Sequence, residues 1–359
     1  QRPDGSFGET VSDNGEVEGG YDSRFGYCAT CVRWVLRGTA EGDVEGVPDT
    51  DVESLVRCIR QAQTYDGGIS EAPFHEAHGG FTYCAIAALA FLDRLPLGDS
   101  QKPTATYRVP GDNLSGIIDL DLTLHWLVYR QTATLDEEDE FDTHADETDT
   151  PATCHDTHSF VAMNQFASQR GEESYKDRPT SHFELQWAGF NGRCNKIADT
   201  CYSFWVLGSL ANLNKLYLAN LDANRKYLLE RTTHFIGGFG KHPGDPPDVY
   251  HSYLGLAALA IGSECSPSDV NLKPLAPAVC MSVDACKRLA NLPWRKKISP
   301  KEPRIFDMYV ENSRTNGVSA VKQSSATASA HAEPAPNGHA ASEPNAHMSN
   351  MDYVAITGG

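Results

Sequence analysis

Two short segments combine side chains that bind zinc in proteins. Residues 199–202 read Asp-Thr-Cys-Tyr and residues 248–251 read Asp-Val-Tyr-His, so a carboxylate, a thiol and an imidazole stand at the starts of two apolar runs. Three protein ligands with one open position are typical of a catalytic zinc site. Because residues two apart do not share a face within a helix, Asp199 and Cys201 can converge only where the chain enters a helix. The alternative is structural, with Asp199 capping the helix and Cys201 filling the core.

A second group of residues has the chemistry of a polyanion site. Arg193 and Lys196 precede the first zinc-type segment, Lys241 precedes the second, and His78 occupies the corresponding loop of an earlier unit. Arginine offers a forked donor, lysine a point charge and Tyr202 a hydroxyl, a set that suits a diphosphate. Ordinary surface charge is the alternative, but it predicts scattered cations rather than cations in the loops that carry candidate metal ligands.

An internal repeat must position these residues. The repeat is marked by four turns. In each turn, small residues precede an apolar residue, and a polar residue follows that apolar residue further along the chain. The apolar and polar members are Phe7 and Asp22, Ile69 and His78, Phe190 and Asp199, and Phe239 and Asp248. The last three pairs are nine residues apart, whereas the first pair is fifteen apart, as if a short loop were inserted. Apolar runs then follow at 28–36, 84–92, 205–213 and 254–261.

Each unit therefore reads as a helix, a glycine-containing turn, a loop, a polar cap and a buried helix. Glycine supplies the left-handed backbone that reverses the chain, and Asp before an apolar run is a natural N-cap. Amphipathic segments at 52–62, 114–130 and 223–233 supply the other helices. Units of about fifty to sixty residues indicate stacked or circularly arranged helical hairpins. The expected fold class is all-α.

Composition excludes several classes of protein. The 359 residues carry a net charge of −18, which argues against nucleic acid because a phosphate-binding surface needs clustered cations. No apolar run approaches the 18 or so residues of a membrane-spanning helix, so none is expected. Hydrophobic residues make up 40%, enough for a large core. The ten cysteines, several of them in apolar runs, favour a reducing, cytoplasmic compartment.

The charge is concentrated in one block. Between Asp136 and Asp149 nine of fourteen residues are acidic and none is basic, which is typical of a solvated, disordered segment. The sequence therefore predicts a barrel in two parts, 1–131 and 183–311, interrupted by an acidic insertion at 132–182. The stretch 312–359, rich in Ser, Ala, Asn and Pro, is predicted to be a disordered tail.

Longer motifs resemble the β subunits of the protein prenyltransferases. Residues 78–84 read His-Gly-Gly-Phe-Thr-Tyr-Cys, residues 192–196 read Gly-Arg-Cys-Asn-Lys, and residues 199–205 read Asp-Thr-Cys-Tyr-Ser-Phe-Trp. From 22–29, which reads Asp-Ser-Arg-Phe-Gly-Tyr-Cys-Ala, to about Ile261 the chain follows the family in order. The resemblance implies an α-α barrel, also called an α/α toroid, with its active site in the central cavity.

The resemblance also implies roles for single residues. Zinc would be bound by Asp199, Cys201 and His251, and its fourth position would take the cysteine thiolate of a C-terminal C-a-a-X substrate. The isoprenoid diphosphate would meet Tyr27, His78, Gly79, Gly80, Arg193, Cys194, Asn195, Lys196, Tyr202, Ser203, Phe204 and Trp205. Of these, Tyr27 and Trp205 would line the apolar trough for the isoprenoid chain.

Lys241 helps to choose among subfamilies. Farnesyltransferase β subunits carry an Asp after the fourth-unit Gly-Gly that assists magnesium binding, whereas type I geranylgeranyltransferases have Lys, and residues 237–241 read Gly-Gly-Phe-Gly-Lys. The resemblance to type I enzymes, and to fungal members among them, implies a catalytic role for Lys241, one Zn²⁺ and no requirement for Mg²⁺. It implies transfer from geranylgeranyl diphosphate to C-a-a-X proteins that end in Leu or Phe, such as Rho-family small GTPases, by a heterodimer with an α subunit.

Two alternatives stay open. The first is a farnesyltransferase β subunit. The second belongs to a different class, an inert helical-repeat scaffold that binds peptides or isoprenoids, although such a scaffold need not keep all three zinc ligands. The family's N-terminal helical hairpins, which limit isoprenoid length, have no counterpart before Gln1, so the sequence does not predict that selectivity.

Overall fold

The computed structural model describes residues 1–38, 40–96, 114–134, 186–262 and 272–298. All of them fall in one of two compact units, residues 1–317, and the second unit, 318–359, lies outside the described residues. The predicted tail at 312–359 and nearly all of the predicted acidic insertion also lie outside them. Thr132, the first residue of that insertion, pairs with Gly189 in a short antiparallel ladder.

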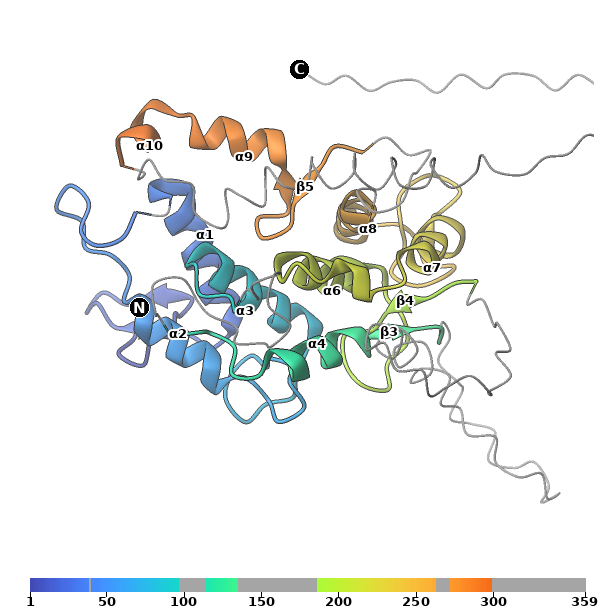
Figure 1. The fold of residues 1–359 in the computed structure, drawn as a ribbon, viewed down its shortest axis with the longest axis horizontal. Helices are drawn as coiled ribbons and strands as arrows, with labels where there is room; N and C mark the ends of the chain where they lie inside the picture. The colour runs from blue at the N-terminus through green and yellow to red at the C-terminus, as the bar shows by residue number, and fades with distance from the viewer. Residues whose placement is uncertain (39, 97–113, 135–185, 263–271, 299–359) are drawn as a thin grey trace, which may run out of the picture. The chain divides into compact units, whose positions relative to one another are not determined.

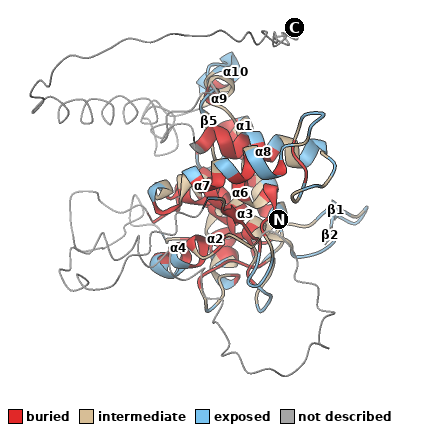
Figure 2. Cartoon of the chain, turned by 90° about the vertical axis from the view of Figure 1, so that its right-hand side faces the viewer, coloured by how far each residue is buried: buried red, intermediate tan, exposed pale blue. Residues whose placement is uncertain are grey.

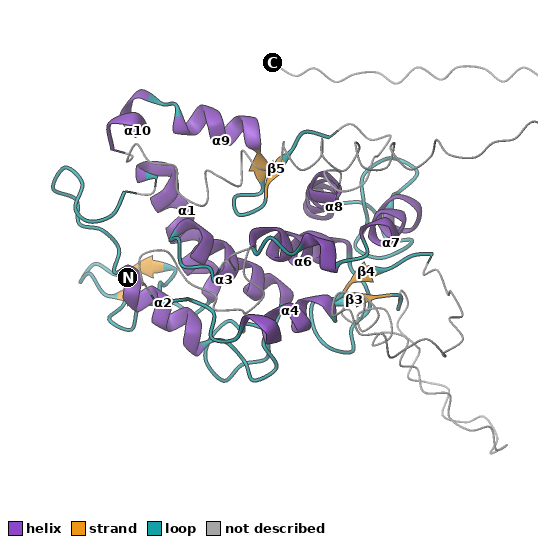
Figure 3. Cartoon of the chain, viewed as in Figure 1, coloured by secondary structure: helices purple, strands orange, loops and turns teal. Residues whose placement is uncertain are grey.

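Helices make up most of the ordered elements (Figures 1 and 3). Four apolar helices are packed in succession, namely α1 (Ser23–Arg37), α3 (Gly79–Phe91), α6 (Thr200–Asn212) and α8 (Val249–Gly262). Between them in sequence lie α2 (Val52–Gln61), α4 (Leu120–Val128), η3 (Leu216–Leu218), α7 (Leu221–Lys226) and the π-helical η4 (Tyr227–Thr232). α4 packs on α6 and α7 packs on α8, so amphipathic helices cover the apolar ones, as the repeat predicts. The predicted amphipathic segment 114–130 is helical only within α4.

Burial is deepest in two of the four apolar helices. In Figure 2 the buried residues concentrate in α3 and α6, where most side chains are shielded from solvent. Among the described residues, no helix has the length and apolarity needed to cross a membrane. The chain continues past α8 into α9 (Val283–Ala290) and α10 (Pro293–Ile298).

The strands of the described residues form three antiparallel pairs of two residues each. They are β1 (Thr10–Val11) with β2 (Val17–Glu18), β3 (Gln131–Thr132) with β4 (Gly189–Phe190), and β5 (Leu275–Ala276) with β6 (Met281–Ser282). The β1–β2 hairpin lies between Phe7 and Asp22, so it is the loop that the fifteen-residue spacing of the first repeat predicts.

One backbone hydrogen bond explains the nine-residue spacing of the other three repeats. The N–H of each polar cap residue donates to the carbonyl of the apolar turn residue nine positions earlier. These bonds join His78 to Ile69 (3.1 Å), Asp199 to Phe190 (3.0 Å) and Asp248 to Phe239 (3.4 Å). Each bond joins the turn to the start of the helix that follows it. The predicted repeat is therefore confirmed as a structural unit.

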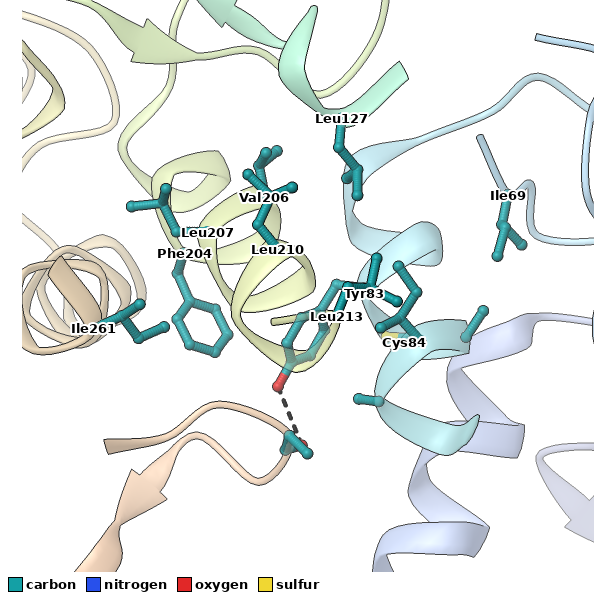
Figure 4. Close-up of a cluster of buried hydrophobic side chains, with 14 of the residues drawn as sticks. Ile69, Tyr83, Cys84, Leu127, Phe204, Val206, Leu207, Leu210, Leu213 and Ile261 are labelled. Atoms are coloured by element: carbon teal, nitrogen blue, oxygen red, sulfur yellow. Dashed lines mark hydrogen bonds between the residues drawn. The ribbon is translucent and has the colours of Figure 1, made fainter. Parts of the chain in front are cut away.

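The β5–β6 hairpin is fixed by tyrosines from three helices. Tyr83 is fully buried, packs against Phe204 with ring centroids 5.1 Å apart, and donates to the carbonyl of Pro277 at 2.7 Å (Figure 4). The hydroxyls of Tyr27 on α1 and Tyr253 on α8 donate to the carbonyls of Ala278 and Cys280. The turn at 277–280 therefore links helices from both ends of the described fold.

A buried ion cluster ties α1 to the following loop. Asp49 accepts from Arg33 at 2.7 Å and from Arg37 at 2.8 Å, and all three side chains are largely shielded from solvent. Burial alone would raise the pKa of Asp49, but the hydrogen bonds and charges of the two guanidinium groups outweigh it and hold the pKa below its usual value.

Asp49→Asn should therefore destabilise the fold in a pH-dependent way. The substitution leaves two buried guanidinium groups without their counter-charge, so we expect a loss of about 3 kcal/mol at neutral pH. Because the folded pKa is depressed, this stabilisation is complete above the unfolded value of about 3.9 and disappears as pH falls through the folded value. Urea unfolding of the variant and the wild type, with exposed Asp13→Asn as control, should converge in acid. A pH-independent difference would contradict this account.

Candidate metal centre and anion-binding loop

The side chains of four helix-start residues accept hydrogen bonds from the first turn of the helix that follows. The bonds run to Asp22 from the N–H of Arg24, to His78 from Gly80, to Asp199 from Cys201, and to Asp248 from His251, at 2.8–3.1 Å. Each cap satisfies a backbone donor that the helix itself leaves unpaired. The caps also fix the orientation of polar side chains at the helix starts.

Two of these caps bring together the predicted zinc ligands. One ligand atom each of Asp199, Cys201 and His251 lies within 4.8 Å of the others, and His251 Nε2 is 3.5 Å from Asp199 Oδ1. Tetrahedral zinc with N and O ligands needs about 3.4 Å between two ligand atoms. Asp199 and Cys201 are each 5% exposed and the His251 side chain 12%, so water has little access to the cluster. The three side chains therefore fit a zinc ion.

Hydrogen bonds orient the imidazole of this cluster. His251 Nδ1 lies 2.5 Å from Asp248 Oδ2, and these bonds hold the pKa of the Asp248 carboxyl below its usual value. Since a carboxylate can only accept, Nδ1 carries a proton and donates to Asp248, and this bond points Nε2 at Asp199. Burial, followed by the charge of Asp199, raises the pKa of the Cys201 thiol. A divalent cation bound here would favour the Cys201 thiolate and so oppose the effects of burial and of the Asp199 charge. A carboxylate that accepts from the other ring nitrogen of a histidine, as Asp248 does, is the usual support of a zinc ligand.

The predicted anion site lies on the neighbouring helix start. His78 Nδ1 accepts the Gly80 N–H at 3.1 Å, and Nε2 lies 2.8 Å from the hydroxyl of Tyr202 on α6. Burial, and then the charge of Arg193, lowers the pKa of His78, and Nδ1 carries no proton because it accepts the Gly80 N–H. The bond at Nδ1 thus assigns the proton to Nε2, which donates to Tyr202. The hydroxyl hydrogen of Tyr202 remains available for a ligand.

Glycines allow this close approach. The N–H of Gly79 donates to the carbonyl of Gly192 at 2.8 Å, which joins the start of α3 to the loop 192–196. A Cβ on Gly192 would lie 2.1 Å from the Tyr202 ring, so any larger residue there would have to displace Tyr202. The N–H groups of Gly79 and Gly80 have partners within the chain, and a Cβ on either glycine would lie 3.2–3.3 Å from Tyr202 or His78, so both also leave room for these side chains. Their predicted contacts with a diphosphate stay a prediction. The role of Gly192 was missed by sequence reasoning, although its place in the motif was a signal.

The predicted cations face solvent at the same rim. Arg193, Cys194, Asn195 and Lys196 are exposed, and Asn195 adopts a left-handed backbone with φ of 58° that turns the loop. Arg193 is paired with Glu76 at 3.2 Å, and both side chains are well exposed. Such a pair is weak enough for an anionic ligand to replace.

Lys241 stands beside the metal cluster. Its carbonyl accepts the N–H of Thr200 at 3.0 Å, next to Asp199 and Cys201, and its side chain is exposed. The structure thus brings Lys241 to the start of α6, as the repeat predicts.

The remaining predicted residues divide into two sets. Half-buried Tyr27 and Trp205 both pack against Tyr83, with ring centroids 5.8 and 4.9 Å away, and form an aromatic row across α1, α3 and α6. Ser203 and Phe204 are completely buried, and Ser203 donates to Asn224 of α7. Phe204 packs against Tyr83 and Trp205 of the aromatic row, with ring centroids 5.1 Å from each, whereas the Ser203 hydroxyl is taken up by its contact with α7.

Comparisons with known proteins agree with this geometry. The family described as prenyltransferase alpha-alpha toroid domain matches residues 1–281. The chain is 30% identical over 277 residues to the geranylgeranyl transferase type-1 subunit beta of Arabidopsis thaliana, covering 77% of this chain and 52% of the relative. It is 26% identical to the subunit of the same name from Dictyostelium discoideum, with coverage of 78% and 54%. It is also 28% identical to the protein farnesyltransferase subunit beta of Schizosaccharomyces pombe, with coverage of 75% and 52%.

A solved structure adds a comparison in three dimensions. Candida albicans protein geranylgeranyltransferase-I complexed with GGPP has a TM-score of 0.53 and 27% identity, and the match covers 82% of this chain and 63% of that one. The chain spans about half the length of the curated relatives it matches. The family match over most of the chain, together with the helical-hairpin fold, is decisive: the chain belongs to the prenyltransferase family and carries its alpha-alpha toroid domain.

Proposed function

We propose that this chain is the β subunit of a zinc-dependent protein geranylgeranyltransferase of type I. The observation that carries the proposal is the convergence of Asp199, Cys201 and His251 beside a rim of exposed cations. An inert scaffold has no need for a buried Asp-Cys-His cluster with a carboxylate behind its imidazole. Relatives named as type I β subunits support the same reading.

The zinc ligands leave one position for a substrate. Zinc, when bound, supplies positive charge that favours the thiolate of a C-terminal C-a-a-X cysteine over the thiol. Asp199 is then a ligand rather than a general base, and Asp248 keeps His251 in the ligating tautomer. No side chain needs to remove the thiol proton during transfer.

The anion site serves the second substrate. Transfer forms a bond between sulfur and C1 of the isoprenoid and breaks the bond from C1 to the diphosphate oxygen, so the leaving diphosphate takes the electron pair. Arg193, Lys196 and the Tyr202 hydroxyl are donors for the charge that develops there. C1 must lie about 3–3.5 Å from the sulfur. The aromatic row of Tyr27, Tyr83 and Trp205 gives the apolar chain a surface to lie against.

Lys241 favours geranylgeranyl transfer over farnesyl transfer. Its backbone contact with Thr200 keeps it at the metal rim, where a fixed ammonium can take the place of a magnesium ion at the leaving group. Farnesyl transfer is the second candidate, since a farnesyltransferase β subunit is also among the relatives. The protein substrates are C-a-a-X proteins ending in Leu or Phe, including Rho-family small GTPases, in the reducing cytoplasm.

The zinc assignment is tested by Cys201→Ala. The substitution removes a thiolate ligand and leaves only Asp199 and His251, so zinc content and prenyl transfer should fall together by at least tenfold. Elemental analysis of the purified protein measures the first and isoprenoid transfer the second. Cys286→Ala, which removes a buried thiol on α9, is the matched control and should keep its zinc. Full zinc occupancy in the Cys201 variant would refute the assignment.

The choice of subfamily is tested by Lys241→Asp. Wild-type transfer should not depend on magnesium, because the ammonium already supplies the charge. The variant should transfer more slowly without magnesium and recover part of its rate when magnesium is added. Lys215→Asp, a change at a half-exposed lysine beyond the C-terminal end of α6 and so remote from the metal rim, should show neither effect. A wild-type enzyme that needs millimolar magnesium would show the subfamily to be wrong.

The partner is tested by co-expression with a prenyltransferase α subunit. The rim cations of this chain are Arg193, Lys196 and Lys241. With these three alone, one side of a bound diphosphate would face water, and dielectric screening would weaken each interaction. We therefore expect turnover with geranylgeranyl diphosphate, faster than with farnesyl diphosphate, only in the α-containing complex. Deleting 312–359 or the block Asp136–Asp149 should leave the complex intact. Robust turnover by the chain alone, or loss of the complex on either deletion, would contradict these expectations.

A further inference from the structure

Arg130 lies directly beneath the loop 192–196. It follows α4, is 5% exposed, and stacks its guanidinium 4.7 Å from the centre of the Trp126 ring. Nη2 donates to Cys194 Sγ at 3.3 Å and Nε donates to the Trp126 carbonyl. The Arg130 carbonyl accepts the N–H of Asn191, so backbone and side chain both hold this loop.

The charge of Arg130 has no counter-ion among the described residues. Three other buried arginines are paired with carboxylates, Arg33 and Arg37 with Asp49 and Arg94 with Glu53. Arg130 instead has a sulfur, a carbonyl and a ring as neighbours, and within the described part of the chain its Nη1 has no hydrogen-bond partner. Burying an uncompensated charge and an unsatisfied donor costs several kcal/mol, so a fold keeps such a group only if something offsets the cost.

The loop that Arg130 contacts carries two further cations. Arg193 and Lys196 are both exposed, and the charge of Arg193 is, after burial, the next cause that lowers the pKa of His78 at the start of α3. Among the described residues, the carboxylate paired with this loop is Glu76, an exposed group in a weak ion pair. An anion bound at the loop would meet both exposed cations and would supply the counter-charge that Arg130 lacks among the described residues.

We propose that Arg130 is a positioning residue for the diphosphate. It holds Cys194 and Asn191 in place from below and adds a buried positive charge to the site without touching the ligand. The inference rests on the proposed function and deepens it, because it assigns part of the affinity for diphosphate to a residue outside the exposed cation set.

The test compares two substitutions in the complex with the α subunit. Arg130→Gln removes the charge and should weaken binding of inorganic pyrophosphate and of geranylgeranyl diphosphate about tenfold, whereas Arg130→Lys keeps the charge and should stay within about threefold. KM for the peptide substrate and binding of the uncharged alcohol geranylgeraniol should not change. Arg295→Gln is the matched control, since Arg295 is equally buried, stacks on Trp34 at 4.8 Å and lies on α10.

Several outcomes would overturn the proposal. Pyrophosphate binding by Arg130→Gln equal to that of the wild type, or weakening of geranylgeraniol binding to the same degree, would show a merely structural role. If Arg130→Gln does not fold, the Arg130→Lys variant provides the test. Loss of pyrophosphate binding in that variant, which keeps the charge, would also refute the proposal. Wild-type protein that binds neither diphosphate would instead mark the failure of the proposed function.

Discussion

The hydrogen bond from a helix's first turn to the side chain before it is the interaction on which the site depends. At Asp199 the same carboxylate oxygen accepts the Cys201 N–H and faces His251 Nε2. A helix would lose about 1 kcal/mol without its cap, so the position tolerates few side chains on stability alone. At the cap positions themselves, any chemistry is therefore confined to side chains that also cap, namely Asp199 and His78.

Repetition turns one local arrangement into two different sites. The bond across nine residues and the cap that follows it recur in three units, so the helix starts on α3, α6 and α8 are built alike. The units differ in which further polar atom the cap residue orients. His78 directs Nε2 to Tyr202 and thereby orients a hydroxyl, whereas Asp248 directs the His251 lone pair to the metal cluster. Both sites follow from adjacent packing of three equivalent helices.

Local features of this protein could be predicted from its sequence, and features that depend on distant contacts could not. Spacing and cap chemistry predicted the repeat, the inserted first loop and the convergence of Asp199 and Cys201, because they rest on bonds within nine residues. Ser203 shares a motif with predicted site residues, but its hydroxyl donates to Asn224 of α7, 21 positions away, and no local pattern predicts that contact. Arg130 lies 64 positions from the sulfur it contacts, and no pattern in the sequence marks that approach.

The tyrosine contacts with the turn at 277–280 bear on how the chain is made. Helical hairpins contact their neighbours and can form as they emerge from the ribosome. Tyr27, however, finds its acceptor at Ala278, 251 residues later. At a synthesis rate of 5–20 residues per second that acceptor appears roughly 10–50 s after the tyrosine. During this interval the Tyr27 hydroxyl and the apolar face around it are open to chaperones, and the same holds for Trp34 on α1 until Arg295 of α10 has been made.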